Sequence, residues 1–280
     1  MRYFEFTPPA PLHRYVEKVW HCEADHHEFQ CWSAPMLNHE LVINFSEYYH
    51  FQAVKNGCAL MANFQNPNAW INGIQTRPIN IESKGKHEMM GVLFKAHGLK
   101  AFTKFHSGEF EQQFIDPLLI FGAGFNELVE KLYLEQNIQG RYEHLCEFLI
   151  ECYIHTEMPK YLESCLHYFA NENDQMVTVK NACDQFSISN KSLVSSFNKH
   201  IGITPLKFIN LTRVNQAIRM LCNNPNQSLT ELAFKLHYAD QAHFTKSFKA
   251  AVGFSPSEYL QAYSNSRIES DAPNLIFQPG

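Results

Sequence analysis

Five residues in a short stretch near the C-terminal end carry groups that can contact DNA: Gln241, Ala242, Thr245, Lys246 and Lys249. The Gln241 amide can form two hydrogen bonds with adenine, and the Lys246 ammonium group can donate to guanine O6 or N7. The methyl groups of Ala242 and Thr245 can contact the methyl group of thymine, whereas Lys249 suits a phosphate. This chemistry requires the five side chains to share the exposed face of one helix.

The surrounding stretch, residues 228–259, predicts such a helix together with its neighbours. Asp240 is a candidate N-cap, because its carboxylate can accept the free N–H groups of the first helical turn. Phe244 and Phe248 have i, i+4 spacing and mark the buried face, and Gly253 suits a left-handed C-cap. An amphipathic helix upstream and a capping box downstream are indicated by Leu229, Leu232, Ala233 and Leu236 and by Ser255, Pro256 and Glu258, respectively. Two short helices with a tight turn between them match a helix-turn-helix unit.

Residues 178–209 repeat this pattern with a shift of 51 residues. The shift superimposes the buried, capping and stop positions: Ala182 on Ala233, Ser189 on Asp240, Leu193 on Phe244, Phe197 on Phe248, Gly202 on Gly253, Pro205 on Pro256 and Phe208 on Tyr259. Joint matches of cap, core pair and stop indicate an internal repeat. The exposed face of the first unit is then Asn190, Lys191, Val194, Ser195 and Asn198, with Lys191 and Lys199 suited to phosphates.

A single helix is predicted between the two units, from Pro205 to about Cys222. Its length of roughly 27 Å suits two recognition helices that lie about one DNA turn, roughly 34 Å, apart on one duplex. Arg213, inside this helix, either contacts a phosphate or pairs with Asp240 across the two units. We favour the pairing, which would fix the relative orientation of the units.

The first 95 residues predict short strands rich in aromatic and β-branched residues, at 16–23, 29–32, 40–46, 58–64, 69–76 and 87–95. Turn signals separate them: Lys55-Asn56-Gly57, Asn66-Pro67-Asn68 and Lys84-Gly85-Lys86. This spacing is typical of a small antiparallel barrel or sandwich. From Gly98 the periodicity becomes helical, with helices at 125–136 and at about 142–170, the latter interrupted near Pro159.

The predicted fold class is α+β, with an N-terminal antiparallel β-barrel or sandwich-like domain with trailing helices and an all-α C-terminal domain of two helix-turn-helix units joined by a linker helix. We expect a β-rich sensor or dimerisation domain at 1–135 and a helical linker at 136–176. The DNA-binding domain is expected at 177–265 and a tail at 266–280. The polar stretch 171–177 is interpreted as a hinge.

Charge is distributed unevenly along the chain, although its net value is −5. Residues 1–170 hold 13 Lys+Arg against 20 Asp+Glu, whereas residues 171–280 hold 10 against 8. The mild positive excess therefore falls on the helix-turn-helix half, where a DNA partner needs it. No stretch has the length of a signal peptide or of a membrane span, so we expect a cytoplasmic protein without a membrane partner. The eight cysteines are scattered and are expected to be reduced core residues.

Three further groups of residues suggest other chemistry. His21, Cys22, Asp25, His26 and His27 are candidate metal ligands, but their spacing matches no standard zinc or iron site. Cys146, Cys152 and Cys165 are candidate redox sensors, but buried structural thiols are the commoner role. The candidate lining of a ligand pocket is Trp20, Trp32, Phe45, Phe64 and Trp70, and such residues more often belong to the core. The chain has no nucleophile elbow, phosphate loop or dinucleotide fingerprint.

The last 90 or so residues resemble the AraC/XylS family of transcription regulators. The resemblance rests on I-G-I-T-P-L-K-F-I and V-G-F-S-P-S-E-Y-L, which close the two units, and on H-Y-A-D-Q-A-H-F-T-K-S-F-K at 237–249. The chain departs from the family at 236–239, where a glycine usually precedes an aromatic residue, and at Ser195, where arginine is common. A weaker resemblance to the β-rich sensor of some members rests on I-N-G-I-Q-T-R-P and G-V-L-F-K-A-H-G-L-K-A-F.

The leading hypothesis is therefore a non-enzymatic, sequence-specific transcription regulator that binds double-stranded DNA and needs no cofactor. Its N-terminal domain is expected to bind a small-molecule effector, to form a homodimer, or both, and an activator would also contact RNA polymerase. We assign no catalytic or metal-binding residues and leave the effector-binding residues unknown. Two alternatives stay open: a metal- or ligand-binding β-barrel enzyme with an accessory helical domain, and a helix-turn-helix module that binds a protein partner.

Overall fold

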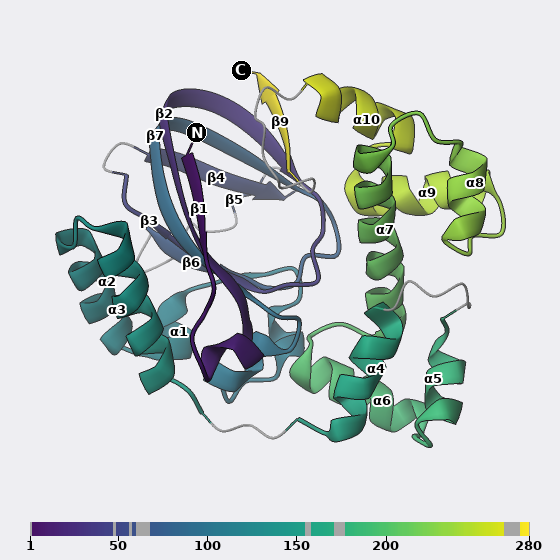
Figure 1. The fold of residues 1–280 in the computed structure, drawn as a ribbon, viewed down its shortest axis with the longest axis horizontal. Coiled ribbons are helices and arrows are strands. Elements are labelled where there is room, and N and C mark those ends of the chain that lie inside the picture. The colour runs from purple at the N-terminus through teal and green to yellow at the C-terminus, as the bar shows by residue number, and fades with distance from the viewer. Residues whose placement is uncertain are drawn as a thin grey trace.

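The computed structural model describes residues 2–46, 49–55, 58–59, 68–154, 158–170, 177–265 and 275–279. The strands are β1 (Arg2–Phe6), β2 (Val16–Ser33), β3 (Glu40–Asn44), β4 (Tyr49–Lys55), β5 (Cys58–Ala59), β6 (Ala69–Asn72), β7 (Ile79–Phe94), β8 (Phe114–Ile115) and β9 (Leu275–Pro279). The helices are α1 (Pro117–Phe121), α2 (Gly124–Leu134), α3 (Ile138–Glu151), α4 (Lys160–Ala170), α5 (Val179–Gln185), α6 (Asn190–His200), α7 (Pro205–Asn223), α8 (Leu229–Lys235), α9 (Gln241–Val252) and α10 (Pro256–Asn265). In the view of Figure 1, the sheet lies between α2 and α3 on the left and the C-terminal helices on the right, and α7 stands upright among the latter.

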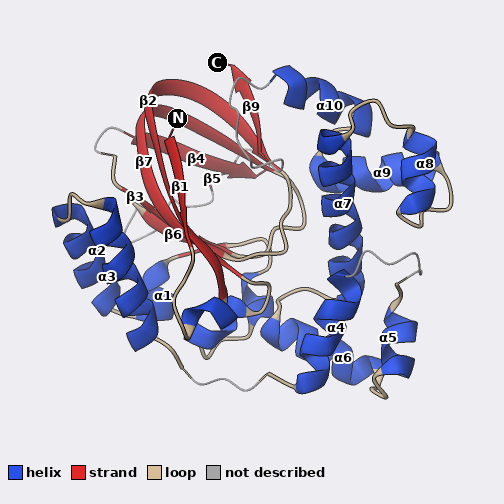
Figure 2. Ribbon diagram, in the orientation of Figure 1, coloured by secondary structure: helices blue, strands red, loops and turns tan. Residues whose placement is uncertain are grey.

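The strands form one antiparallel sheet with the order β1-β2-β7-β3-β6-β8. β4 pairs with the N-terminal half of β7, and β9 pairs with the C-terminal half of β2. The α+β class and the antiparallel N-terminal half are thus confirmed. The expected barrel is wrong for the described residues, because their pairings do not join β1 to β8, and the sheet stays open and curved (Figure 2).

Two long central strands, β2 and β7, replace shorter strands and a turn that the sequence predicts. The runs expected at 16–23 and 29–32 are one strand, β2, with an irregularity between Ala24 and His27. The turn expected at Lys84-Gly85-Lys86 lies inside β7, which has β2 on one side and β4 on the other. Backbone hydrogen bonds on both sides outweigh the local preference for a turn. Lys55 of β4 pairs with Cys58 of β5, and the Asn56-Gly57 part of the first predicted turn lies outside the described residues.

One face of the sheet carries the N-terminal core. Buried side chains of β2, β3 and β7, such as Val19, Ile43 and Val92, pack against Phe125 of α2 and Leu145 of α3. Removing apolar surface from water in this way is the main driving force for docking the helices. The predicted interruption near Pro159 is confirmed, because α3 ends at Glu151 and α4 begins at Lys160.

Arg141 of α3 anchors this helix to the sheet by charge as well. Its side chain is buried and its Nη1 donates to Glu88 Oε1 at 2.5 Å. The guanidinium group also lies over the ring of Phe45, 4.2 Å from its centroid. A planar cation suits both contacts at once.

The C-terminal helices have two separate cores. Phe169 of α4 and Phe197 of α6 share one with Phe208, from the first half of α7. Ile218, from its second half, joins the other together with Phe248 of α9. The predicted linker helix is confirmed, and its two halves stabilise one unit each.

The two halves of the chain are in contact. Trp32 of β2 packs edge-on against Phe254, with ring centroids 5.5 Å apart. Lys207 at the start of α7 pairs with Glu111 at 2.5 Å. β9, in the expected tail, returns to the sheet and pairs with Phe29–Ser33 of β2 (Figure 1).

Of the stretch interpreted as a hinge, residues 171–176 lie outside the described residues. No helix in the described part of the chain is long and apolar enough to cross a membrane.

Candidate DNA-binding surface

The second helix-turn-helix unit is capped as its sequence predicts. Asp240 precedes α9, and its Oδ1 accepts from the His243 N–H at 2.7 Å. Gly253 ends the helix with a φ of 90°, a left-handed conformation that glycine adopts without a Cβ clash. Ser255 and Glu258 form the capping box, because each side chain accepts from the other's backbone N–H, at 3.3 and 2.7 Å. Asp240 and Gly253 thus fix the two ends of α9, and the capping box begins α10.

The first unit has the same construction. Ser189 precedes α6, and its Oγ accepts from the Ser192 N–H at 3.1 Å. Thr204 caps α7 and Pro205 occupies its first turn. Leu193 and Phe197 of α6 are fully buried. The internal repeat is therefore a repeat of structure.

The shift between the units changes by one residue within the turn. Ile188 N–H donates to the Cys183 carbonyl, and Tyr238 N–H donates to the Ala233 carbonyl, so this part of the turn repeats with a shift of 50. Cys183 rather than Ala182 is thus the counterpart of Ala233, and the second turn is one residue longer. The shift of 51 holds for the caps and recognition helices that follow, α6 and α9.

In the second turn, His237 takes the backbone conformation for which a glycine is usual in the family. Its φ is 59°, so a histidine takes the left-handed conformation, and the aromatic side chain that follows, Tyr238, is buried. Left-handed backbone costs a residue with a Cβ about 1–2 kcal/mol.

Replacing His237 with glycine is expected to raise the free energy of unfolding by about 0.5–1 kcal/mol. The strain relieved exceeds the entropy that glycine adds to the unfolded chain. Urea unfolding followed by circular dichroism measures the change. Ala250→Gly, at an exposed position inside α9, is the matched control and should lower the same quantity by about 1 kcal/mol. A loss of stability in His237→Gly would contradict the assignment of strain.

The residues predicted to contact DNA lie on the outward faces of α6 and α9. Those on α6 are all exposed: Asn190, Lys191, Val194, Ser195 and Asn198. Those on α9 are exposed apart from Thr245, which is half-buried: Gln241, Ala242, Thr245, Lys246 and Lys249. Each set forms one helical face, opposite Leu193 and Phe197 or Phe244 and Phe248.

Neighbouring side chains orient two of the residues on α9. The Gln241 amide oxygen accepts from the Thr230 hydroxyl of α8 at 2.7 Å, and a second lone pair remains for a base. Lys249 Nζ lies 3.2 Å from the Glu258 carboxylate, and both groups are more than half exposed. Hydrogen bonds from Ser255 hold the pKa of Glu258 low, at about 2. A surface ion pair of this kind is weak, so Lys249 keeps access to a phosphate.

The C-terminal end of α6 lies against the N-terminal half of the chain. A Cβ built at Gly108 would fall 1.9 Å from Asn198 Oδ1, so Asn198 contacts the backbone of the 3₁₀ helix Ser107–Phe110. His200, at the end of α6, is buried, and its pKa is lowered to about 4 by burial and by the nearby Lys199 and Lys100. Asn198 is therefore a predicted contact residue that also touches the N-terminal half.

Arg213 has a structural role, with a partner other than the expected one. Its Nη2 donates to the Val177 carbonyl at 3.1 Å, which ties α7 to the chain just before α5. Asp240 is occupied as the N-cap of α9. The predicted pairing across the two units is wrong, because Arg213 is bonded to the Val177 carbonyl and Asp240 to the His243 N–H.

The other candidate chemistry finds little support among the described residues. His21 faces the core with a pKa lowered by burial, and Cys22 points to the opposite face of β2. The side chains of Asp25, His26 and His27 lie outside the described part. Burial raises the pKa of the Cys146, Cys152 and Cys165 thiols to about 11, which disfavours the reactive thiolates that a redox sensor needs.

The described aromatic residues that were candidates for a ligand pocket are divided between parts of the fold, although Trp20 and Trp70 lie on one face of the sheet, in register across Gly91 and Val42. Phe45 is in the N-terminal core and Trp32 packs on the second helix-turn-helix unit. Trp20 stacks with Tyr3, at 6.2 Å between ring centroids. Phe64 lies outside the described residues.

Comparison with known proteins places both units in one family match. Residues 182–262 match the model of a helix-turn-helix domain, and residues 4–116 match that of a domain of unknown function. The HTH-type transcriptional activator RhaS of Escherichia fergusonii is 35% identical over 78 residues, 28% of either chain. RhaS of Enterobacter sp. is 31% identical over 94 residues, 34% of this chain and 32% of that protein. The chain thus spans about a third or less of the length of these curated relatives.

Two solved structures are also similar. ToxT from Vibrio cholerae has a TM-score of 0.47 and 11% identity, over 93% of this chain and 98% of that chain. The DNA-binding domain of AdpA, solved in complex with a target DNA, has a TM-score of 0.36 and 20% identity, over 40% and 100%.

Proposed function

Because residues 182–262 form a helix-turn-helix domain of the AraC type, we propose that the protein is a sequence-specific DNA-binding transcription regulator. The observation that carries the proposal is the pair of capped units joined by one helix, α7, which contributes side chains to the cores of both units. α7 has 19 residues and is roughly 29 Å long. A connecting helix of this length suits recognition helices that reach half-sites about one DNA turn apart.

The two units contribute differently to the proposed recognition. α9 presents an amide, a hydroxyl and an ammonium group in Gln241, Thr245 and Lys246, all of which can bond to base edges. The corresponding positions of α6 are Asn190, Val194 and Ser195. We propose that Lys191 and Lys249 contact phosphates, which position the protein without reading sequence.

Lys246→Ala is expected to weaken binding to a selected duplex by about 1–3 kcal/mol and to relax base preference at one position. The reason is the loss of a donor to a guanine edge. A duplex is first selected from a random pool with the wild-type protein, and labelled-duplex titrations at moderate salt then compare the proteins on all four bases at each position.

Lys235→Ala is the matched control, because Lys235 is exposed on α8, outside the predicted contact set. It removes the same charge and should weaken all duplexes slightly and equally. Similar effects of both substitutions would remove Lys246 from base recognition. No sequence-selective binding by the wild-type protein would overturn the proposed function.

We propose that the N-terminal half controls DNA binding by the two helix-turn-helix units. Its contacts with α6, through Gly108 and Asn198, and with Phe254, through Trp32, give it a physical route to them. We propose that it binds a small-molecule effector, forms a homodimer, or does both, and that an activator of this kind would contact RNA polymerase. A non-enzymatic role in the cytoplasm, without a cofactor, fits this proposal.

A further inference from the structure

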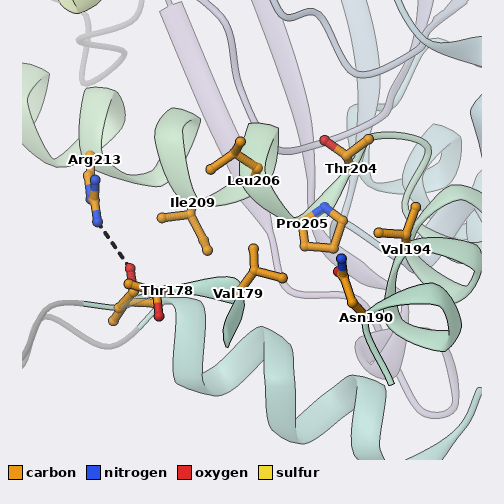
Figure 3. Close-up of a pocket in the computed structure, with 10 residues that line it drawn as sticks. Thr178, Val179, Asn190, Val194, Thr204, Pro205, Leu206, Ile209 and Arg213 are labelled. Atoms are coloured by element: carbon orange, nitrogen blue, oxygen red, sulfur yellow. Dashed lines mark hydrogen bonds between the residues drawn. The ribbon is translucent and has the colours of Figure 1, made fainter. Parts of the chain in front are cut away.

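An apolar cavity of about 420 Å³ opens beside α6 in the first unit (Figure 3). Its walls include Val179 of α5, Val194 of α6, and Leu206 and Ile209 of α7. Val194 is 37% exposed and Leu206 60% exposed, so both apolar side chains stand at a mouth that reaches solvent. An apolar group of a ligand can be removed from water by contact with these side chains.

The cavity is built by the starts of three helices. Thr178 and Thr204 cap α5 and α7, and Asn190 is the first residue of α6. The hydrogen bond from Arg213 to the Val177 carbonyl holds the start of α5 against α7 at one end (Figure 3). Helix ends and a hydrogen bond thus define the shape of the cavity.

The cavity is continuous with the predicted reading face. Two of its lining residues, Asn190 and Val194, are on that face, and Lys191 is exposed beside them on α6. Of its ten lining residues none is acidic, and Arg213 carries a positive charge. A polyanion with an apolar group on its surface suits this combination, and the major groove of DNA offers one such group, the C5-methyl of thymine.

The second unit differs at the equivalent positions. With the shift of 51, Val194 corresponds to Thr245, Ser195 to Lys246, and Leu206 to Ser257. At positions 194 and 206 the first unit has apolar groups at the mouth of a cavity, where the second unit has the hydroxyl groups of Thr245 and Ser257. The two units are therefore equipped to read different features of a base pair.

We propose that the first unit recognises thymine through its methyl group, with Val194 as the residue that determines this preference. The inference rests on the proposed function and names what the first unit reads. The methyl group enters the apolar mouth between Val194 and Leu206, and the sugar-phosphate backbone lies over the polar rim of Thr178, Asn190 and Thr204. Recognition then needs no long hydrogen-bonding side chain at position 195.

Uracil tests the proposal, because it differs from thymine only in lacking the methyl group. In the selected duplex, each thymine of the first half-site is replaced by uracil in turn. The first half-site is the one whose base preferences Lys246→Ala leaves unchanged. For wild-type protein, at least one replacement should weaken binding about three- to fivefold, as expected for one buried methyl group.

Val194→Ala removes the proposed contact without disturbing a buried position. For this variant the same replacement should change affinity by less than about 1.5-fold, while thymines in the second half-site keep their wild-type effect. Val194→Thr, which retains one methyl group in the same branched shape, should keep part of the sensitivity. Thermal unfolding monitored by circular dichroism verifies that each variant is folded.

Three results would overturn the inference: a first half-site without thymine, a wild-type protein indifferent to uracil there, or equal sensitivity in wild type and Val194→Ala. These results leave sequence-selective DNA binding intact. They are therefore distinguishable from failure of the proposed function, in which no duplex is selected.

Discussion

Phe248→Ala is expected to destabilise the second helix-turn-helix unit by about 3–5 kcal/mol. The Phe248 ring is fully buried, and its centroid lies 5.7 Å from those of both Phe244 and Tyr259. Truncation removes these contacts and leaves a cavity between α9 and α10. Since α9 carries the residues proposed to read bases, specific binding should be lost with the fold of the unit.

The loss should be local, because each unit has its own core. Amide hydrogen exchange should show protection in α8 to α10 falling about 10²–10⁴-fold, with little change around Phe197 in the first unit. Phe197→Ala should give the reverse pattern. Phe234→Ala is the control for the residue type, because Phe234 is 59% exposed and its truncation should cost little. Uniform loss of protection in both units would contradict the assignment of two separate cores.

Local signals explain why the helical half could be predicted from the sequence. An N-cap such as Asp240 and a stop such as Gly253 act within one turn of the helix end that they define. Together with the spacing of Phe244 and Phe248, they fixed the orientation of α9 before any tertiary contact was known. The predicted contact residues of both units are accordingly on outward faces in the structure.

Long-range contacts explain what the sequence left undetermined. The pairing of β9 with β2 joins segments more than 240 residues apart, and no local pattern indicates it. The contact between Asn198 and Gly108 depends on how the two halves of the chain dock. The cavity beside Val194 requires the starts of α5, α6 and α7 to converge, although an exposed apolar residue at a reading position gave a hint of it.

Insertion of base pairs between the half-sites is expected to reduce the affinity of the selected duplex about 10²-fold or more. Binding by two linked units exceeds binding by one by about 10²–10⁴-fold only while both can engage. Five added base pairs turn the half-sites to opposite sides of the duplex, and ten restore the side but roughly double the separation. α7 is one continuous helix whose two halves are packed in the two cores, so it cannot lengthen to follow.

A matched control separates loss of joint binding from loss of the site. A duplex with the first half-site scrambled should bind as weakly as either inserted duplex, because each leaves one unit engaged. If the ten-base-pair insertion alone retained affinity, the units would be joined flexibly, and α7 would not set their spacing.

The central claim is that two readers held by α7 engage one duplex together. The ratio of dissociation constants between the selected duplex and its five-base-pair insertion measures this most directly, in one titration at fixed salt. The structure predicts a ratio of about 100 or more. A ratio near 1 would contradict joint reading and leave at most one unit in contact with bases.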